Sequence, residues 1–329
     1  MTTTAVDESW PMIESEVFRI FDQIAAEGAG VPVALSDRLA ELGWADIEDA
    51  YPASACDEVL FRAQAISLAN TDCLDRLMLR ELAGALPERV DGLVLPAIAD
   101  GHWPMSTAQH VEGIATGTVT GRVAVPVSGP SNTVLLGITD LDALHHRKLD
   151  TFDASLCWTH LSGAIDPVVD ATIPWRAAVR AAHCALATEL LAVTGAMLDL
   201  AVEHVCSRVQ FGKPIGAYQS PRHALAEASA ALEGARALRD EARRQGGDFA
   251  ASIAKASAGR AHRSMSDVAM QVCGAIGLTA EHRLHRYVQR GFHLDALLGS
   301  YRLLEAALAQ SLFADEDLDA AVPTVVTWC

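Results

Sequence analysis

Apolar residues near the start of the chain recur at helical spacing. Between Trp10 and about Leu86 they follow the three- and four-residue steps that give a helix one buried face. The positions that carry this pattern are Ile13, Val17, Ile20, Phe21, Ile24, Val59, Ala63 and Ile66. We therefore expect an N-terminal helical domain over residues 1–90.

The pattern changes after residue 91. Short β-branched runs replace the helical spacing, the clearest being Gly117–Val127 and Thr133–Ile138, and Gly, Pro, Ser and Asn separate them. Such runs are typical of strands bounded by turns. Because the segment 91–172 is short, we expect a reduced β domain that cannot hold many strands.

Long helical patterns return from Pro174 onward. The first extends to Val205, and the second runs from Ser220 to about Arg244. The apolar positions of the first are Val179, Leu186, Leu190, Val193, Met197, Leu200 and Val205. This length and spacing predict a C-terminal helical bundle over residues 173–329.

Glycines divide the rest of the predicted bundle. Gly246 and Gly247 interrupt the helical pattern, and Asp248 stands where a capping residue is expected for a helix that reaches Cys273. A last helix is expected from about Leu294 to Phe313. The fold class predicted for the whole chain is mainly α with a small β region in the middle.

Composition excludes several classes of function. The 329 residues are half hydrophobic and carry a formal charge of -17, which speaks against a nucleic-acid surface. The most apolar stretch, Ala181–Val193, is interrupted by His183, Thr188 and Glu189, so no membrane span is expected. The acidic residues of Met1–Trp10 do not look like a secretory signal. A cytoplasmic location is the expectation.

The seven cysteines are scattered along the chain and form no CxxC pair, which argues against a disulfide framework or a zinc ribbon. They are Cys56, Cys73, Cys157, Cys184, Cys206, Cys273 and Cys329. We expect reduced thiols, mostly in the core.

Two strings of residues carry a resemblance to a known family. The first is Arg208-Val-Gln-Phe-Gly-Lys-Pro-Ile, followed by Gln219 and Leu225-Ala226, and the second runs from Gln271 through Gly274 and Ala275 to Tyr287. In this order and spacing they resemble the RxQFGxPI...Q...LA and QxxGGxGxTxE signatures of acyl-CoA dehydrogenases. A weaker similarity covers Leu39–Trp44. The short first two regions resemble those of the family's reduced subunits.

The resemblance implies an FAD cofactor. An arginine offers a planar fork of donors that suits a pyrophosphate, and a glutamine can satisfy donors and acceptors nearby. In the family, the matching Arg, Phe and Gln reach across a subunit interface to the FAD of the neighbour. The cofactor-binding residues that this implies are Arg208, Phe211, Gln219, Gln271, Gly274, Ala275 and Ser300, with Ala275 in place of the family's second Gly. Ser300 either contacts the flavin or caps the last helix.

The catalytic carboxylate of the family is missing. The reaction removes an α-proton from an acyl-CoA while hydride leaves the β-carbon for the flavin, so a base is required. Of the two family positions for this Glu, one is Leu298, before Gly299-Ser300, and the other is Ala182. Glu189 and Asp295 are candidates for a relocated base, although Glu189 is more readily explained as the partner of a cation.

A second departure concerns the flavin ring. The family supports it with a WxTN strand, and the corresponding run here is Val125-Pro-Val-Ser-Gly, in which Val127 has no hydroxyl to offer. Ring binding by this chain's own β region is therefore not expected. His183, beside Ala182, is either a polar residue buried in the core or a hydrogen-bond donor in a substrate pocket. His282 and His285 find no third ligand at helpful spacing, so no metal site is expected.

Three functions remain open at this point. The first is a subunit of an α2β2 acyl-CoA dehydrogenase that lends FAD contacts to a catalytic partner subunit, with a steroid-derived CoA ester as substrate by analogy with reduced heteromeric members. The second is a stand-alone homo-oligomeric acyl-CoA dehydrogenase with a relocated base. The third is a structural relic of the family without flavin.

Overall fold

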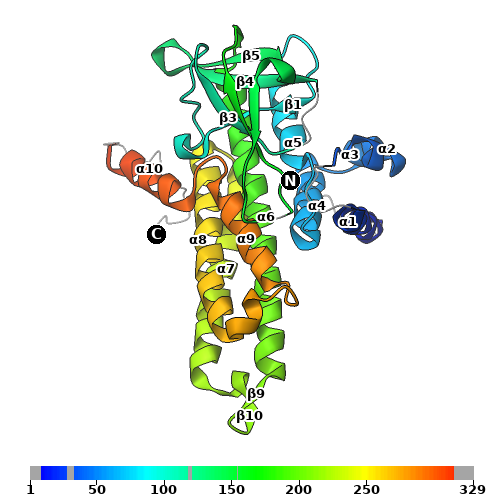
Figure 1. Ribbon diagram of the computed structural model, residues 1–329, viewed down its shortest axis with the longest axis vertical. Coiled ribbons are helices and arrows are strands. Elements are labelled where there is room, and N and C mark those ends of the chain that lie inside the picture. The colour runs from blue at the N-terminus through cyan, green and yellow to red at the C-terminus, as the bar shows by residue number, and fades with distance from the viewer. Residues whose placement is uncertain (1–8, 28–32, 118–120, 154, 315–329) are drawn as a thin grey trace, which may run out of the picture.

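The computed structural model describes residues 9–27, 33–117, 121–153 and 155–314. A long helical bundle forms the body of the molecule, with a β region at one end and a group of shorter helices along one side (Figure 1). This order of helices, β region and bundle confirms the fold class expected from the sequence. The division into separate domains stays a prediction.

Five helices form the N-terminal group: α1 (Trp10–Glu27), α2 (Ser36–Glu41), α3 (Trp44–Ala50), α4 (Ala53–Ser67) and α5 (Cys73–Leu82). The apolar stripe of α1 is buried at Val17, Ile20, Phe21 and Ile24, as the spacing predicts. In α4, Val59 and Ala63 are buried too. Helix α1 packs on α4, and α4 and α5 pack on the bundle.

The β region holds two four-stranded sheets. One has the order β1 (Gly92–Leu93), β4 (Arg122–Ser128), β5 (Val134–Asp140), β8 (Pro167–Asp170), and the other β2 (Leu95–Pro96), β3 (Val111–Ala115), β7 (Thr159–Gly163), β6 (His145–Lys148). Among the described strands of these two sheets, β1 and β4 are the one parallel pair, and the other pairs are antiparallel. The expectation of few strands was wrong, because all the strands except β4 and β5 have only two to five residues, which is too short to show an alternating pattern.

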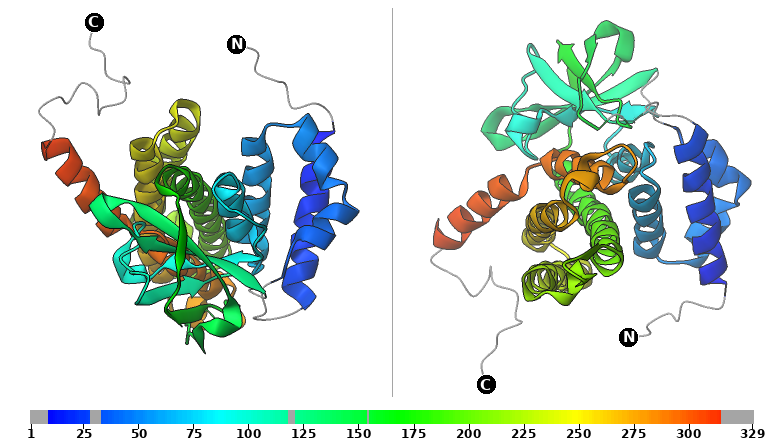
Figure 2. Two further views of the ribbon diagram at one scale, coloured as in Figure 1. Left: turned by 90° about the horizontal axis from the view of Figure 1, so that it is seen from above. Right: turned by 60° about the horizontal axis from the view of Figure 1, so that its bottom comes forward.

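Three long helices and one shorter helix build the bundle. They are α6 (Thr172–Ser207), α7 (Gln219–Gln245), α8 (Asp248–Cys273) and α9 (Leu284–Ala296), and α10 (Tyr301–Ala314) projects away from them (Figure 2). Helix α6 is long and apolar enough to cross a membrane, but it packs against α4, α5, α8 and α9. It is the core helix of the bundle, and its buried polar residues include His183, Thr188 and Glu189.

Two sequence expectations about the bundle were wrong. Gly247, not Asp248, is the capping residue of α8, and the Asp248 carboxylate instead accepts a hydrogen bond from Arg180 at 3.1 Å. The single helix expected from Leu294 to Phe313 is two helices, since α9 ends at Ala296 and α10 begins at Tyr301. Leu298 and Gly299, with φ of 54° and 99°, adopt a left-handed backbone that no helix can continue through.

The six cysteines within the described residues are all free thiols, as expected, and Cys56, Cys73 and Cys273 are buried. Cys329, residues 1–8 of the N-terminal segment and residues 118–120 of the Gly117–Val127 run lie outside the described residues.

Candidate functional site

The first family-like string forms a hairpin at the end of the bundle farthest from the β region (Figure 1). Strands β9 (Val209–Gln210) and β10 (Lys213–Pro214) pair antiparallel, and the backbone N–H of Ile215 donates to the carbonyl of Arg208 at 2.8 Å. Tyr218, just before α7, braces the hairpin because its hydroxyl donates to the carbonyl of Gln210 at 3.2 Å. The hairpin is therefore an ordered element.

Phe211 occupies the tip of this hairpin. It and Gly212 form a two-residue turn with φ of 52° and 84°, the combination that favours Asn-Gly rather than an aromatic residue. A left-handed conformation costs a side chain such as Phe about 1–2 kcal/mol, and Phe211 is also 94% exposed. A strained backbone that presents an aromatic ring to solvent indicates a binding role.

The second string lies at the C-terminal end of α8 and just beyond it. Gln271, Gly274 and Ala275 are exposed there, and Gly274 ends the helix with φ of 62°. No atom would lie within 4 Å of a Cβ added at Gly274, so the space beside its backbone is open. This is the open approach that the resemblance assigns to a cofactor.

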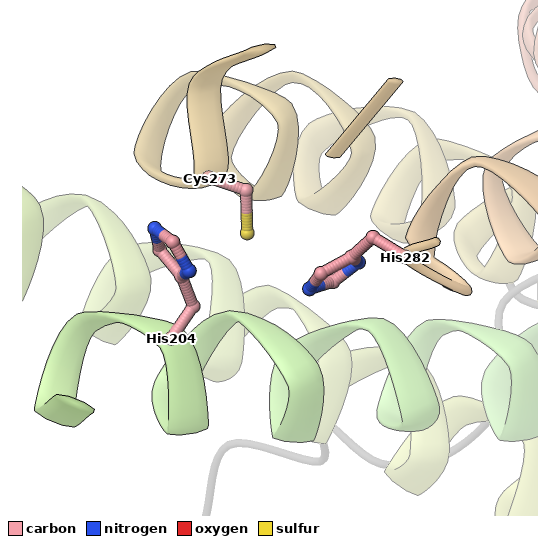
Figure 3. Close-up of side chains that lie close together, drawn as sticks. All are labelled: His204, Cys273 and His282. Carbon is pink, nitrogen blue, oxygen red and sulfur yellow. The ribbon is translucent and has the colours of Figure 1, made fainter. Parts of the chain in front are cut away.

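The two strings converge in space. His204, one turn before Arg208 on α6, lies beside Cys273, two residues after Gln271, and beside His282 (Figure 3). The ligand atoms of these three side chains all lie within 4.8 Å of one another. Gln219, the first residue of α7, follows the hairpin directly and is exposed. The structure thus gathers the predicted diphosphate contacts at one end of the bundle.

Exposed apolar residues surround this end. Within the described residues, large hydrophobic side chains stand in solvent on α6, on the hairpin and on the turn after α8, namely Val202, Val209, Phe211, Ile276 and Leu278. Exposed apolar residues grouped in this way are typical of a surface that binds another molecule.

Ser300 lies apart from the other predicted cofactor residues. Its neighbour Gly299 lies near Gly101 of the β region, at the other end of the bundle. The carbonyl of Ser300 accepts the N–H of Leu304, while the Asp295 carboxylate accepts the N–H of Tyr301 at 2.9 Å. Asp295 therefore performs the side-chain capping of α10 that the sequence offered as one role of Ser300.

The two family positions for the catalytic Glu meet at this second end. Nε2 of His183, next to Ala182, lies 3.0 Å from the carbonyl oxygen of Leu298. Nδ1 of the same ring lies 3.4 Å from the hydroxyl of Ser252. Burial lowers the pKa of His183 to about 3, with the charge of Lys255 acting in the same direction. The ring is therefore neutral at pH 7, and it donates from Nε2 and accepts at Nδ1.

A buried lysine holds the same loop. Nζ of Lys255 donates to the carbonyl oxygens of Asp295 at 2.9 Å and of Gly299 at 2.5 Å. Burial lowers the pKa of Lys255 to about 8, while burial raises that of Asp295 and Lys255 opposes the rise. Asp295, one of the two candidate bases, is thus occupied in fixing the backbone of the loop and the start of α10.

Glu189, the other candidate base, is 1% exposed. Its Oε2 accepts a hydrogen bond from Nε2 of Gln64 at 3.1 Å, and its Oε1 lies 3.9 Å from Nη1 of Arg290. Burial raises the pKa of Glu189 to about 7, with Arg290 and Gln64 opposing the rise. This enclosed position matches the partner of a cation more closely than a base that meets substrate.

A cavity of about 270 Å³ opens beside His183, between the β region and the start of α6 and α8. Its lining includes His102, Trp103, Arg176, Arg180 and Asp248. Of the lining residues, His102, Trp103, Arg176 and Arg180 could not be predicted from the sequence, because they come from separate segments and none belongs to a family-like string. A basic and aromatic lining of this kind suits an acidic, partly apolar ligand.

Val127 is fully buried between the two sheets. On β4 it pairs with Leu135, and it offers neither a hydroxyl nor an exposed face. The residues present therefore fit the diphosphate half of FAD at the hairpin end but do not fit its ring at the position that the family uses.

Comparison with known proteins agrees with these observations. Residues 178–301 match the family model described as "Acyl-CoA dehydrogenase, C-terminal domain". Acyl-CoA dehydrogenase IpdE2 of Mycobacterium tuberculosis is 34% identical over 121 residues, which are 37% of this chain and 36% of that protein. The chain thus spans little more than a third of the length of the curated relatives that it first matches.

Solved structures extend the likeness over nearly the whole chain. The ChsE4-ChsE5 complex from Mycobacterium tuberculosis matches with a TM-score of 0.70 and 18% identity, covering 94% of this chain and 99% of that one. The Tcur3481-Tcur3483 steroid ACAD G363A variant matches with a TM-score of 0.68 and 19% identity, covering 92% and 98%. At this identity the likeness establishes the fold. In sequence, the similarity to acyl-CoA dehydrogenases covers the bundle, and in fold it covers nearly the whole chain.

Proposed function

We propose that this chain is one subunit of an FAD-dependent acyl-CoA dehydrogenase and that it lends contacts for the diphosphate half of FAD to a different, catalytic subunit. The assembled enzyme removes a proton from the α-carbon of an acyl-CoA thioester and transfers a hydride from its β-carbon to the flavin. The product is a 2,3-enoyl-CoA. In this arrangement the chain binds and orients, and its partner supplies the base.

The observation that carries the proposal is the position of the hairpin. The hairpin that follows Arg208 and carries Phe211 at its tip lies at one end of the bundle, and this chain's own β region lies at the other (Figure 1). A single copy therefore cannot bring both regions to the same flavin. Another subunit whose β region approaches the hairpin resolves this, and the exposed Phe211 then becomes part of the interface.

The absence of a carboxylate supports a catalytic partner that differs from this chain. Ala182 and Leu298 are both buried and apolar, and their segments are joined by the bond from His183 to the carbonyl of Leu298. Glu189 and Asp295 are engaged in structural contacts. A second copy of this chain would bring the same deficiency, so a different subunit has to provide the base.

The assembly and substrate follow by analogy with similar structures. Two of these are described as the ChsE4-ChsE5 complex and as the Tcur3481-Tcur3483 steroid ACAD. We propose an α2β2 heterotetramer that acts in the cytoplasm on a steroid-derived CoA ester. The cavity beside His183 lies next to basic residues and is the place where this chain would contact such a substrate.

The test is visible flavin absorbance. The chain is expressed alone and together with a candidate partner, an acyl-CoA dehydrogenase-like subunit that carries a glutamate at either family position. We expect colourless protein alone and a yellow complex on co-expression, bleached by the acyl-CoA substrate. A yellow chain on its own that acyl-CoA bleaches contradicts the proposal and supports a stand-alone enzyme with a relocated base. A colourless product under both conditions contradicts it too and supports a relic without flavin.

A further inference from the structure

Three metal-binding side chains from separate parts of the sequence meet beside the hairpin. His204 comes from the last turns of α6, Cys273 is the last residue of α8, and His282 precedes α9 (Figure 3). Their ligand atoms all lie within 4.8 Å of one another. The sequence expectation of no metal site concerned His282 with His285, whereas the packing of α6 and α8 brings His204 and Cys273 to His282.

The distances are compatible with a tetrahedral metal ion. With metal–nitrogen bonds of about 2.0–2.1 Å and a metal–sulfur bond of about 2.3 Å, tetrahedral ligands lie about 3.3–3.6 Å apart. The three side chains have to close by roughly 1 Å from their present positions. Rotation of the two imidazole rings supplies a movement of this size, since both rings are only partly buried.

The chemistry of the three ligands selects the metal. One thiolate and two neutral imidazoles are a donor set of the kind that zinc takes, and a fourth position remains for water. A histidine binds a metal ion through its neutral ring and a cysteine through its thiolate. Burial raises the pKa of the Cys273 thiol, so the metal has to displace a proton there.

One contact has to change when the metal binds. Nδ1 of His282 accepts the backbone N–H of Leu284 at 3.2 Å. Ligation through Nε2 places the ring proton on Nδ1, so this hydrogen bond opens. Leu284 is the first residue of α9, where backbone N–H groups have no acceptor within the helix, and the exchange therefore leaves α9 itself intact.

We propose that His204, Cys273 and His282 form a zinc site that joins the ends of α6 and α8. The site lies one turn from Arg208 and two residues from Gln271, so a bound ion fixes the relative positions of the two strings. The inference rests on the geometry of the three side chains and not on the flavin proposal. Metal binding is measured on the chain without flavin, so the zinc site can fail or hold independently of the flavin proposal.

Cobalt provides a direct probe. The full chain is reduced, freed of metal with a chelator and titrated with Co²⁺ alone. We expect visible bands of tetrahedral cobalt together with a near-ultraviolet band from thiolate to cobalt, and displacement of both by Zn²⁺. The same titration of the chain within its complex shows whether the site persists after assembly. Absence of these bands in both preparations overturns the proposal.

Matched variants identify the ligands. We expect Cys273→Ser to lose the near-ultraviolet band and His282→Gln to lose the tetrahedral bands. Cys206→Ser, at an exposed position on α6, and His285→Gln, one turn beyond His282, should retain both. Because His282 is partly exposed, its variant keeps the test valid if Cys273→Ser does not fold. Bands that survive in both ligand variants, or that the control substitutions abolish equally, contradict the assignment.

Discussion

Nε2 of His183 donates a hydrogen bond to the carbonyl oxygen of Leu298 at 3.0 Å, across 115 residues of sequence. The bond joins α6 to the loop between α9 and α10. It thereby holds the turn of α6 that contains Ala182 against the loop that contains Leu298, and these are the two positions at which the family carries its catalytic Glu. In this chain the two segments carry no carboxylate at these positions. The neutral ring of His183 and the buried apolar side chains of Ala182 and Leu298 lie there instead.

Restoring a carboxylate to this loop should not create a dehydrogenase. We expect Leu298→Glu, assayed in the chain purified alone, to show no bleaching of flavin by acyl-CoA, because the chain lacks its own ring-binding strand. The variant should also lose about 2 kcal/mol or more of stability in urea unfolding, since Leu298 is buried. Leu303→Glu, on the exposed side of α10, is the matched control. Acyl-CoA-dependent bleaching in Leu298→Glu would refute our account of the missing site.

The acid sensitivity of folding should report the neutral state of His183. Its pKa is about 3 in the folded protein and 6.5 as the reference value, so between these values the unfolded chain binds the extra proton. Its contribution to stability is therefore complete above pH 6.5 and declines as the pH falls. We expect His183→Gln, which retains a donor for Leu298, to reduce the slope of unfolding free energy against pH by up to about 1.4 kcal/mol per pH unit.

Urea unfolding at several pH values between 5 and 6.5 measures that slope. His145→Gln, on the exposed strand β6, should leave it as in the unaltered chain. An unchanged slope in His183→Gln would mean that the ring is already protonated or solvated in the folded state.

A buried ion pair fixes α9 against the rest of the molecule. Nε of Arg290 donates to Asp153 at 2.9 Å, and its other nitrogens donate to the carbonyls of Leu68 and Ala69. Burial alone would raise the pKa of Asp153, but the charge of Arg290 and the hydrogen bonds from Ser155 and Arg290 together lower it. We expect Arg290→Met to destabilise the chain by about 3–5 kcal/mol, because it leaves a buried carboxylate without its cation. The exposed Arg147→Met should change stability by less than about 0.5 kcal/mol in the same thermal or urea unfolding measurement. Equal changes in unfolding free energy for Arg290→Met and Arg147→Met would show that the pair of Arg290 and Asp153 contributes little to stability.

The bundle could be predicted from sequence because its helices repeat their apolar positions over many turns. Repeated apolar positions over several turns identified α6 and α7 nearly to their ends, and the glycines at 246 and 247 separated α7 from α8. The short strands and the break at Leu298 could not be predicted in this way. A strand of two residues has no period, and the break depends on tertiary contacts from His183 and Lys255.

The candidate site could be predicted in part. The strings predict a cofactor role for Arg208 and Gln271, which stays a prediction, but they do not say that the two strings converge or that Ser300 lies at the other end of the bundle. The cluster at Cys273 also escaped prediction, because its ligands are far apart in sequence and each one alone resembles an ordinary helix residue. Only the packing of α6 on α8 brings these three side chains together.

The most direct test of the account is the flavin content of the complex when Arg208 is replaced. The complex is purified with this chain unaltered, with Arg208→Ala, or with Arg147→Ala as an exposed control in the β region. FAD binding is then titrated in each preparation. We expect the Arg208 variant to assemble but to bind FAD roughly 10- to 100-fold more weakly, as loss of charge-assisted hydrogen bonds implies. The control should bind FAD as the unaltered complex does. Equal FAD affinity in all three complexes would contradict the claim that this chain lends its arginine to the partner's cofactor.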